Sequence, residues 1–593
     1  AAKLGQKLCS KKAGGQVPEY PRQELPDATK WDHTKWSPNY RNDNRIETHE
    51  SGTAPCKTAC PAHVAVQGYL KLAAQGRYDE ALALIKRENP LPAICGRVCN
   101  RRCEDACTRG RVDAAVAIDE VKKFIAQRDL DAATRYVPPV VTPTRAGGFD
   151  QKIAIIGAGP AGLSCAFYLA EKGYKPVVFE KNERPGGMLT YGIPSFKLEK
   201  DVIEAEVEII RLMGVEFRYG VEVGRDVTLD ELREQGFKAF YVAIGCQGGR
   251  LAGIPGEDAE DVTVAVDFLR EVNSGKIDAL PGRTIVVGGG NVAIDVARNA
   301  CRLGSEHVEM FCLESEAQMP ASEEERREAV EDGAHISCGW GPKEVHLDEA
   351  GRVCGITFKR CTRVFDDEGR FAPEYDENDL RRVDADRVVM SIGQSIVWGD
   401  LLAGSKVELG RGQGALADPQ TYQTAEPDIF VGGDVYTGPS FAIDAIAAGH
   451  EAAVSIHRFV QPGSTLTIGR NQRRYTALDR DDVVLEGYDN ASREVAHVNR
   501  EREKAAPFSE YVETFTEEQV RAETARCLGC GASIVDPNKC IGCGLCTTKC
   551  AFDAIHLDRD RPECSTMVKY EQKLPSLGKY ALKRAIKIKF GKK

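Results

Sequence analysis

The chain has 593 residues, too many for one hydrophobic core, and at about 150 residues per domain it predicts several domains. Its formal net charge is −10; the stretch 565–593 holds nine Lys or Arg against one Glu, so the remainder carries −18. Such an acidic body argues against nucleic acid as the main partner. No apolar run reaches about 18 residues, the length that spans a bilayer. The first residues contain no apolar signal core either, so we expect a cytoplasmic protein.

The 21 cysteines are clustered rather than dispersed. Six lie between Cys56 and Cys107 and seven between Cys527 and Cys564, at spacings typical of metal ligands. In a reducing cytosol, such clusters indicate metal centres rather than disulfides. The other cysteines are scattered through the middle of the chain, where we interpret them as core residues.

Residues 1–50 contain several prolines and are interpreted as an N-terminal arm, and a small helical iron–sulfur domain is predicted over residues 51–135. Apolar spacing predicts helices at Val64–Ala74 and Tyr78–Lys86. Cubane clusters need four thiolates each and combine close spacings with a remote ligand, which suits this domain. Zinc is the alternative, but four-cysteine zinc sites normally use a CxxC spacing, which is absent here. The candidate ligands are Cys56, Cys60, Cys95, Cys99, Cys103 and Cys107.

The segment Lys152–Glu180 has the order strand, glycine turn, helix, strand and acid. Gly157 permits a tight turn, Gly159 lets backbone N–H groups approach a pyrophosphate, and Gly162 lets helix and strand pack closely. Glu180 can accept a hydrogen bond from a ribose hydroxyl. This context predicts a dinucleotide site rather than a glycine turn in an empty βα unit. The candidate ligands are Gly157, Gly159, Pro160, Ala161, Gly162, Glu180 and Lys181.

Two further glycines extend this first unit into a predicted FAD-binding half over residues 150–255. Gly187 lies in the sequence RPGGML, and Gly245 ends a strand predicted from Phe240. A helix is predicted between them at about Asp201–Met213. Both glycines are therefore candidate cofactor-binding residues.

A second nucleotide fold begins at Arg283 and is assigned to residues 256–384. A strand enters GGGN, a helix follows from about Val292 to Leu303, and a second strand ends at Glu314. Ala293 replaces the third glycine of the fingerprint, which is an accepted variant. The motif predicts a nicotinamide-nucleotide site, with an unused structural βαβ unit as the alternative. Its candidate ligands are Gly288, Gly290, Asn291, Val292, Ala293 and Glu314.

Residues 385–462 are predicted to return to the FAD-binding half. The strand Asp428–Val431 leads into Gly433 and Asp434, and an Ala-rich helix follows over Pro439–Ala453. This order can bring Asp434 to the flavin's ribityl chain and a helix N-terminus to its pyrophosphate or ring edge. The alternative is an acid that only caps the helix.

Residues 463–526 have little apolar periodicity and are interpreted as a long wrapping linker. A ferredoxin-like module follows over residues 527–564, and a basic tail over 565–593. The spacing CxxCxxCxxxC is that of bacterial ferredoxins and predicts a [4Fe-4S] cluster, with zinc as the alternative. For the tail we favour an acidic partner or plain solvation over membrane contact. The cysteines of this region are Cys527, Cys530, Cys540, Cys543, Cys546, Cys550 and Cys564.

The motifs LPAICGRVCNRRCEDAC, IGAGPAGLS, VVGGGNVAIDVAR and VGGDVYTGPSFAIDAIAAG resemble the small (beta) subunit family of glutamate synthase. That family includes the large subunit of NADH-dependent ferredoxin:NADP oxidoreductases and the N-terminal half of dihydropyrimidine dehydrogenase. The resemblance covers about Cys56–Val460. It implies an α/β fold with two Rossmann-like domains, for FAD and NAD(H), between a helical iron–sulfur domain and a ferredoxin-like module. It also implies about three [4Fe-4S] clusters.

Three departures from the family pattern stand out. The CxxC that usually opens the N-terminal domain is absent, since Thr48 and Ser51 stand there. A Gln or Glu that completes one family cluster falls near Lys122, which cannot ligate in the same way. The two arginines that many members carry after the second strand of the second nucleotide fold are replaced by Cys312 and Leu313.

The missing CxxC has a counterpart at the other end of the chain. The stretch Tyr511–Gly531 resembles the segment that precedes the N-terminal domain in relatives. We therefore predict that Cys527 and Cys530 fold back to complete a cluster with Cys56 and Cys107. In this arrangement Cys60, Cys99 and Cys103 hold a second cluster, and Cys540, Cys543 and Cys546 a third with Cys550 or Cys564. The competing arrangement puts Cys527, Cys530 and Cys550 into a second ferredoxin-type cluster.

The sequence thus predicts an NADH-oxidising electron-transfer subunit, in which FAD links two-electron hydride chemistry to one-electron clusters. Electrons would pass to another redox subunit or a ferredoxin, within an electron-bifurcating complex as one option. Hydride transfer needs no protein acid, base or nucleophile, so we expect no catalytic side chain. The alternatives are an NADPH-linked glutamate synthase small subunit and a catalytically silent relay. A thioredoxin-reductase type is disfavoured, because neither nucleotide fold contains a CxxC.

Overall fold

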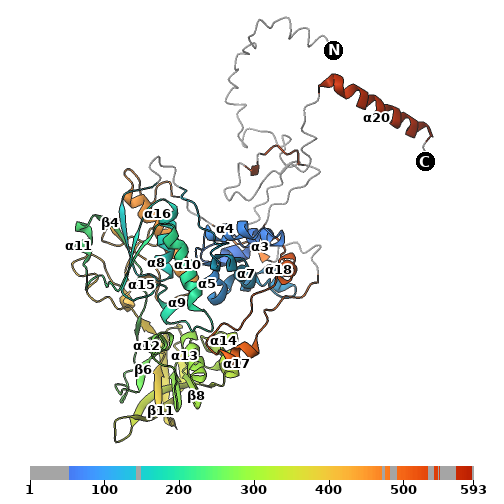
Figure 1. Ribbon diagram of the computed structural model, residues 1–593. Coiled ribbons are helices and arrows are strands. Elements are labelled where there is room, and N and C mark those ends of the chain that lie inside the picture. The colour runs from blue at the N-terminus through green and yellow to red at the C-terminus, as the bar shows by residue number, and fades with distance from the viewer. Residues whose placement is uncertain are drawn as a thin grey trace. The chain divides into compact units, whose positions relative to one another are not determined.

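The computed structural model describes residues 53–141, 148–470, 475–480, 490–531, 540–544, 546–547 and 569–590. Contacts group the chain into two units, Gly52–Ala532 and a second made of Ala1–Ser51 with Ser533–Lys593. Within the larger unit, the helices α3, α4, α5 and α7 form a domain beside two sheet-containing domains (Figure 1).

A domain of short helices opens the larger unit. The two helices expected there are present as α3 and α4. Leu70 of α3 and Leu82 of α4 are both buried in the core of this domain. The first begins at Val66 rather than Val64, because Ala65 is a non-helical N-cap residue. The elements are α2 (Pro55–Ala59), α3 (Val66–Ala74), α4 (Tyr78–Lys86), α5 (Pro92–Val98), α6 (Arg102–Asp105), η3 (Thr108–Arg111) and α7 (Ile118–Leu130).

The first nucleotide fold is a five-stranded parallel sheet in the order β15-β4-β1-β2-β3. Its central strands β1, β4 and β2 are buried except at Lys152 and Lys238, and α8 packs against both β1 and α16. The strands are β1 (Lys152–Ile156), β2 (Val177–Glu180), β3 (Glu216–Tyr219), β4 (Phe237–Val242) and β15 (Ile429–Val431). The helices are α8 (Pro160–Glu171), α9 (Met188–Tyr191), α10 (Lys200–Leu212), α11 (Leu229–Glu234), α15 (Asp434–Thr437) and α16 (Ala442–Val460).

The second nucleotide fold is another five-stranded parallel sheet, in the order β6-β13-β7-β8-β9. The predicted assignment of residues 385–462 to the FAD-binding half is wrong for β13, which pairs with β6 and β7 of this second sheet. The strands are β6 (Val262–Val264), β7 (Arg283–Val287), β8 (His307–Cys312), β9 (His335–Cys338) and β13 (Arg387–Met390). The helices are α12 (Ala265–Asn273), α13 (Asn291–Arg302), η4 (Glu316–Gln318) and α14 (Glu323–Glu331).

Two smaller sheets accompany the second nucleotide fold, and the sequence patterns predict neither. Three antiparallel strands pair in the order β10-β11-β12, over Trp340–Leu347, Val353–Phe365 and Phe371–Val383. The last of these is mostly exposed and charged, so it lacks the alternating apolar pattern of a half-buried strand. A two-stranded ribbon joins β5 (Gly248–Gly249) to β14 (Gln394–Ser395), and the short η5 spans Arg411–Gln413.

Residues 490–531, which we call the strap, are folded rather than a plain linker. They contain α17 (Arg500–Ala505) and α18 (Glu517–Ala525), and α18 packs against α3 and α7 of the helical domain. Thr516 opens α18 with a capping box, in which its side chain accepts from the backbone N–H of Gln519 and the Gln519 side chain accepts in return. The predicted linker 463–526 therefore includes regular structure in its second half.

The second unit contains the helix α20 (Tyr570–Phe590), whose described side chains are exposed. Of the cysteines predicted to hold the ferredoxin-type cluster, the structure describes Cys540, Cys543 and Cys546. Cys550 and Cys564 lie outside the described residues. Among the helices that the structure describes, none is both long enough and apolar enough to cross a membrane.

Candidate functional site: a dinucleotide cavity and two groups of thiols

The first glycine turn has the geometry that its sequence predicts. Gly157 has φ +104°, and a Cβ there would lie 2.5 Å from the carbonyl oxygen of Ala243 on the neighbouring strand. A Cβ at Gly162 would collide with the Gly157 carbonyl oxygen, so only glycine allows α8 to start this close to β1. Gly159, by contrast, has no atom within 4 Å of its Cβ position. The turn is closed on the protein side and open toward a cavity.

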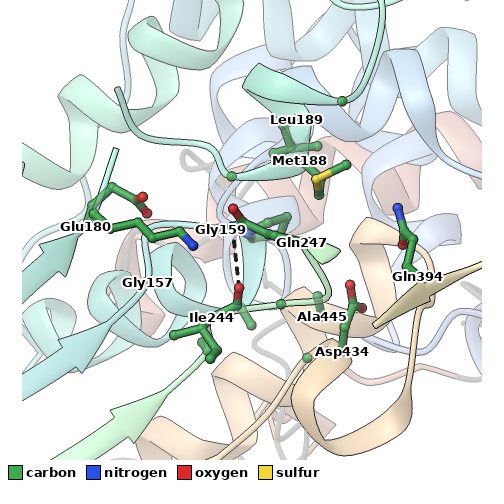
Figure 2. A pocket seen from close by; sticks show the side chains of 18 of the residues that line it. Gly157, Gly159, Glu180, Met188, Leu189, Ile244, Gln247, Gln394, Asp434 and Ala445 are labelled. Carbon is green, nitrogen blue, oxygen red and sulfur yellow. Dashed lines mark hydrogen bonds between the residues drawn. The ribbon is translucent and has the colours of Figure 1, made fainter. Parts of the chain in front are cut away.

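That cavity gathers the residues predicted to hold FAD (Figure 2). They come from the first turn, the end of β2, the segment after it and the end of β4, which are far apart in sequence. The predicted residues that line it are Gly157, Gly159, Pro160, Ala161, Glu180, Lys181, Gly187, Gly245, Gly433 and Asp434. Gly162 is not among them, because it packs against the turn.

Glu180 lies at the edge of this cavity and is 3% exposed. Its Oε2 accepts a hydrogen bond from the Ala158 backbone N–H at 2.8 Å, and its Oε1 accepts from the backbone of Asn182 at 2.9 Å. The carboxylate therefore ties the glycine turn to the end of β2. This fixes its position where the motif places a ribose hydroxyl.

Asp434 lines the cavity from the start of α15. The preceding Gly433 has φ +66°, and its Cβ position is 3.0 Å from the Ala161 Cβ, so glycine lets the two segments approach. Burial raises the pKa of Asp434 to about 6. Its Oδ1 accepts from the Ser440 backbone N–H at 3.3 Å, a long bond that leaves the carboxylate able to accept from a ligand.

The second glycine turn repeats this design. Gly288 has φ +147° and is packed against Ser391 of the neighbouring strand, whereas Gly290 caps α13 and has no atom within 4 Å of its Cβ position. The Asn291 side chain is used locally, since its Oδ1 accepts from the Ser322 backbone N–H at 3.3 Å. Ala293 is fully buried, as a residue in the glycine position must be for close packing.

Glu314 lies directly beside this second turn. A Cβ at Gly289 would stand 3.0 Å from Glu314 Oε2 and 2.9 Å from the Cβ of Cys312. Cys312 itself is buried at the end of β8, with its Sγ 3.7 Å from that of Cys338. The group nearest to the turn at this strand end is therefore an acid rather than a cation.

The two nucleotide folds meet at the first cavity. Val292 and Asp295, from the first turns of α13, line the same cavity as the first glycine turn. Val292 was expected to bind the nicotinamide nucleotide from its motif, but Asp295 was not singled out. The other predicted residues of the second fold, Gly288, Gly290, Asn291, Ala293 and Glu314, lie outside this cavity's lining.

Several cavity residues were not among the predicted ligands. They come from α9, the segment after β4, the β14 ribbon and the loop after it. Gln247 and Gln394 face the cavity as polar side chains, and Gln247 Nε2 donates to the Ile244 carbonyl at 3.4 Å (Figure 2). Only Met188 and Leu189 carry a signal, since they follow the glycine pair ending at Gly187.

A separate small cavity in the helical domain brings four predicted metal ligands together. It is lined by Cys56 and Cys107 of that domain and by Cys527 and Cys530 of the strap. Burial raises the pKa of Cys56, and the neighbouring thiols of Cys527 and Cys107 raise it further. Four thiolates this close repel one another unless a cationic centre binds them, which suits an iron–sulfur cluster. Their juxtaposition matches the predicted fold-back of the CxxC.

Buried charges hold the strap on this cavity. Arg526 is 1% exposed; it donates to Glu523 at 2.6 Å and to Asp113 at 3.0 Å, and α3's Gln67 donates to the carbonyl of Cys530. Arg109 in turn donates to the Arg526 carbonyl at 3.1 Å. Because Arg526 and Glu523 are both buried, losing one of the two leaves the other charge uncompensated.

A second group of thiols lies between α5, α6 and α7. A Cβ at Gly96 would stand 2.7 Å from the Cα of Lys123, so this glycine lets α5 and α7 pack at backbone distance. The packing places Lys122 of α7 beside the thiols of α5. Burial raises the pKa of each thiol, and the Lys122 ammonium partly offsets the rise. The group consists of Cys60, Cys95, Cys99 and Cys103.

Family models match three parts of the chain. Residues 151–449 match the model described as pyridine nucleotide-disulphide oxidoreductase. Residues 47–134 match dihydropyrimidine dehydrogenase domain II with its 4Fe-4S cluster, and residues 533–556 match a 4Fe-4S binding domain.

Named relatives cover most of the chain. The beta subunit of the NADP(+)-dependent formate dehydrogenase of Moorella thermoacetica is 35% identical over 81% of this chain and 70% of its own length. The small chain of the NADPH glutamate synthase of Escherichia coli is 36% identical over 69% and 89%. The beta subunit of the NADPH-Fe(3+) oxidoreductase of Geobacter sulfurreducens is 32% identical over 81% and 75%.

Proposed function

The chain belongs to the glutamate synthase small-subunit-like family of FAD- and NAD(P)-dependent iron–sulfur oxidoreductases, and we propose that this member oxidises NADH and delivers single electrons to a partner. One observation carries the proposal. The first turns of α13, from the second nucleotide fold, line the cavity formed by the first. A nucleotide held at the second glycine turn can thus extend along α13 into the cavity that suits FAD.

The residues of the first cavity fit FAD. Gly159 leaves open space at a helix N-terminus, where backbone N–H groups would face the pyrophosphate. Glu180 would accept from the adenosine ribose, and Asp434 from the ribityl chain. When bound, FAD supplies the conversion between a two-electron hydride and single electrons. The described side chains hold and orient the two nucleotides, so no catalytic acid, base or nucleophile is assigned.

The thiol groups fit two [4Fe-4S] clusters in the larger unit. Cys56, Cys107, Cys527 and Cys530 would supply four ligands to one cluster. Cys60, Cys99 and Cys103 would supply three ligands to the second, with Cys95 beside them. The ferredoxin-type spacing of Cys540, Cys543, Cys546 and Cys550 would hold a third, with Cys564 as the alternative to Cys550.

Preference for NADH rests on the charge beside the second turn. NADPH carries a 2'-phosphate that is normally met by arginine, whereas here Glu314 lies 3.0 Å from the Gly289 Cβ position. An acid repels that phosphate but accepts from the free 2'-hydroxyl of NADH. The names of the three relatives mention NADP(+) or NADPH, which favours an NADPH-linked function as the second candidate.

The partner is proposed from the same relatives. Two of them are named as beta subunits and the third as a small chain, so we infer that this chain also works with another redox subunit or a ferredoxin. The ferredoxin-like residues 533–556 would provide the exit toward it. An electron-bifurcating assembly is one option for this complex, and we do not propose it as a separate function.

Anaerobic stopped-flow absorbance with NADH and NADPH tests the proposed function. NADH should bleach the flavin faster, and reduced cluster signals should follow by EPR. Two matched variants separate the sites: Gly159→Ala should weaken FAD retention, while Gly290→Ala should keep FAD but raise the NADH concentration needed for bleaching. Both Cβ positions are open and both backbones have negative φ, so neither variant should disturb the fold. If neither NADH nor NADPH bleaches the flavin, the proposed function is excluded and the catalytically silent relay is the candidate that is left.

A further inference from the structure

The second thiol group contains a buried lysine that the proposed function does not use. Lys122 is 6% exposed and lies on α7, where the close α5–α7 contact at Gly96 brings it to the thiols. Its ammonium Nζ pairs with the buried carboxylate of Asp119, which favours the charged form of the lysine. A lysine in this setting stays charged.

The charge on Lys122 is only partly cancelled by its neighbours. Its Nζ donates to the carboxylate of Asp119, which is 2% exposed. Asp119 Oδ2 also lies 3.9 Å from the guanidinium Nε of Arg101, which pairs more closely with Glu324, at 3.1 Å. The Asp119 backbone N–H donates to Glu104 at 2.8 Å, and Glu104 is itself paired with Arg493 at 2.6 Å. Each charge of this network thus has a partner, but Lys122 acts on the thiols of Cys99 and Cys103 more strongly than Asp119 does.

A positive charge in a dry site acts strongly on a redox centre. Each one-electron reduction adds a negative charge to the cluster and its thiolates, and a nearby ammonium stabilises that charge. The interaction is larger in a protein interior than in water, because the effective dielectric constant is lower. A neutral side chain in place of Lys122 would provide no such stabilisation.

We propose that Lys122 is a positioning residue that raises the reduction potential of the iron–sulfur cluster at Cys60, Cys99 and Cys103. The inference rests on the proposed second cluster. It gives this cluster a higher potential than its thiolate ligands alone would set, which makes it an electron-accepting site within the helical domain. Asp119 moderates the effect by sharing its charge with Lys122 and Arg101.

The test is an EPR-monitored redox titration of the full-length holoprotein and its variants. Lys122→Met roughly keeps the length of the side chain and removes its charge. It should lower the midpoint potential of one cluster by at least about 59 mV, which corresponds to a tenfold change in the ratio of reduced to oxidised cluster. Lys122→Arg should restore the potential, and Asp119→Asn should raise it. The opposite directions distinguish a charge effect from a general disturbance.

Lys86→Met is the matched control. Lys86 is also fully buried in this domain, but it pairs with Asp129 at 2.7 Å, and no thiol figures among the groups that act on it. This variant should lose stability without moving any cluster potential.

An unchanged potential in Lys122→Met with full iron content would overturn the inference. If that variant loses iron, Asp119→Asn decides: a higher potential supports the charge effect, and an unchanged one refutes it. Absence of a second cluster from the wild-type protein, seen in iron and labile-sulfide content, would instead contradict the proposed function.

Discussion

Replacing Glu314 with Gln should shift nucleotide selectivity toward NADPH. Glu314 Oε2 stands 3.0 Å from the Gly289 Cβ position, at the strand end where the motif binds the adenosine ribose. Two unit charges at about 4 Å repel by about 1 kcal/mol in water and about 4 kcal/mol near a protein surface. Because Glu314 is half-buried, we expect the lower part of this range, about 1 to 2 kcal/mol, or about 5-fold to 30-fold in kcat/KM for NADPH.

The assay compares kcat/KM for NADH and NADPH, with an artificial electron acceptor, in the wild type and in Glu314→Gln. NADH efficiency should fall slightly, because an amide accepts less strongly than a carboxylate from the 2'-hydroxyl. Glu316→Gln is the control, since that acid is exposed in η4. Adding Leu313→Arg should strengthen the shift, whereas Cys312→Arg would place a guanidinium in the core beside Cys338. A wild-type preference for NADPH, or no gain for NADPH in Glu314→Gln, would refute the reasoning.

Three further outcomes follow from the structure. Cys56→Ser combined with Cys527→Ser should remove about four irons per chain by iron analysis, with the other clusters retained, if both thiols hold one cubane. Arg526→Met leaves Glu523 buried and unpaired, so it should cost about 3 to 5 kcal/mol and lower the thermal midpoint. Burial raises the pKa of Asp434 to about 6 in the folded, flavin-free protein, so folding favours the protonated carboxyl. The resulting stability is present below about pH 4 and is lost as the pH rises through 6. Asp434→Asn should flatten this pH dependence of the free energy of unfolding, measured by denaturant titration.

The glycine turns were predictable because the shape of each turn depends on contacts between residues close together in the sequence or on the neighbouring strand. The shape of the first turn depends on Gly157 and Gly162, whose missing side chains are required by contacts within one βαβ unit and its neighbouring strand. The family models and the parallel sheets confirm the fold class that these motifs predict. The partner of β13 was not predictable in this way. A short apolar strand ending on glycine suits either sheet, and only its pairing with β6 and β7 assigns it to the second.

The strap shows a different limit of sequence patterns. Its helix α18 buries Val520 together with charged side chains, and Glu523 is 0% and Arg526 1% exposed. A buried face built from ion pairs looks like a solvated, charged segment in the sequence, so it was interpreted as linker. Asp295 was missed for a related reason. Its place in the first cavity results from how two domains pack, which no local motif records.

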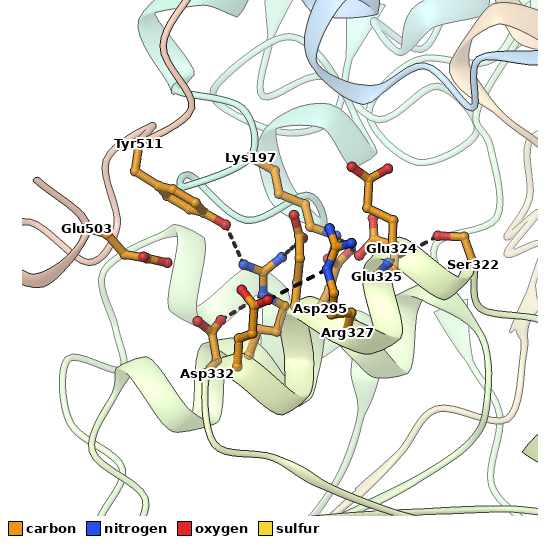
Figure 3. Close-up of polar contacts among 12 residues, drawn as sticks. Lys197, Asp295, Ser322, Glu324, Glu325, Arg327, Asp332, Glu503 and Tyr511 are labelled. Carbon is orange, nitrogen blue, oxygen red and sulfur yellow. Dashed lines mark hydrogen bonds and ion pairs between the residues drawn. The ribbon is translucent and has the colours of Figure 1, made fainter. Parts of the chain in front are cut away.

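One helix connects these distant parts. Asp295, at the cavity, also pairs with Lys197 at 2.6 Å (Figure 3). Farther along α13, Arg298 pairs with Asp332 at 2.7 Å and donates to the hydroxyl of Tyr511 of the strap at 2.6 Å. Arg302, one turn later, pairs with Glu503 of the strap at 2.8 Å. Positions three, four and seven residues apart lie along one side of a helix, so α13 faces the cavity at its start and the strap along its length.

The strap then continues from α13 to the helical domain. Glu510 pairs with Arg97 at 2.9 Å and with Lys123 at 2.6 Å, next to the α5–α7 contact that holds the second thiol group. Seventeen residues later, the same segment brings Cys527 to the first thiol cavity. The helix that would carry the nicotinamide nucleotide and the thiols that would hold a cluster are therefore braced by one stretch of chain. Displacing that stretch from α13 would disturb the cluster site before it disturbed either glycine turn.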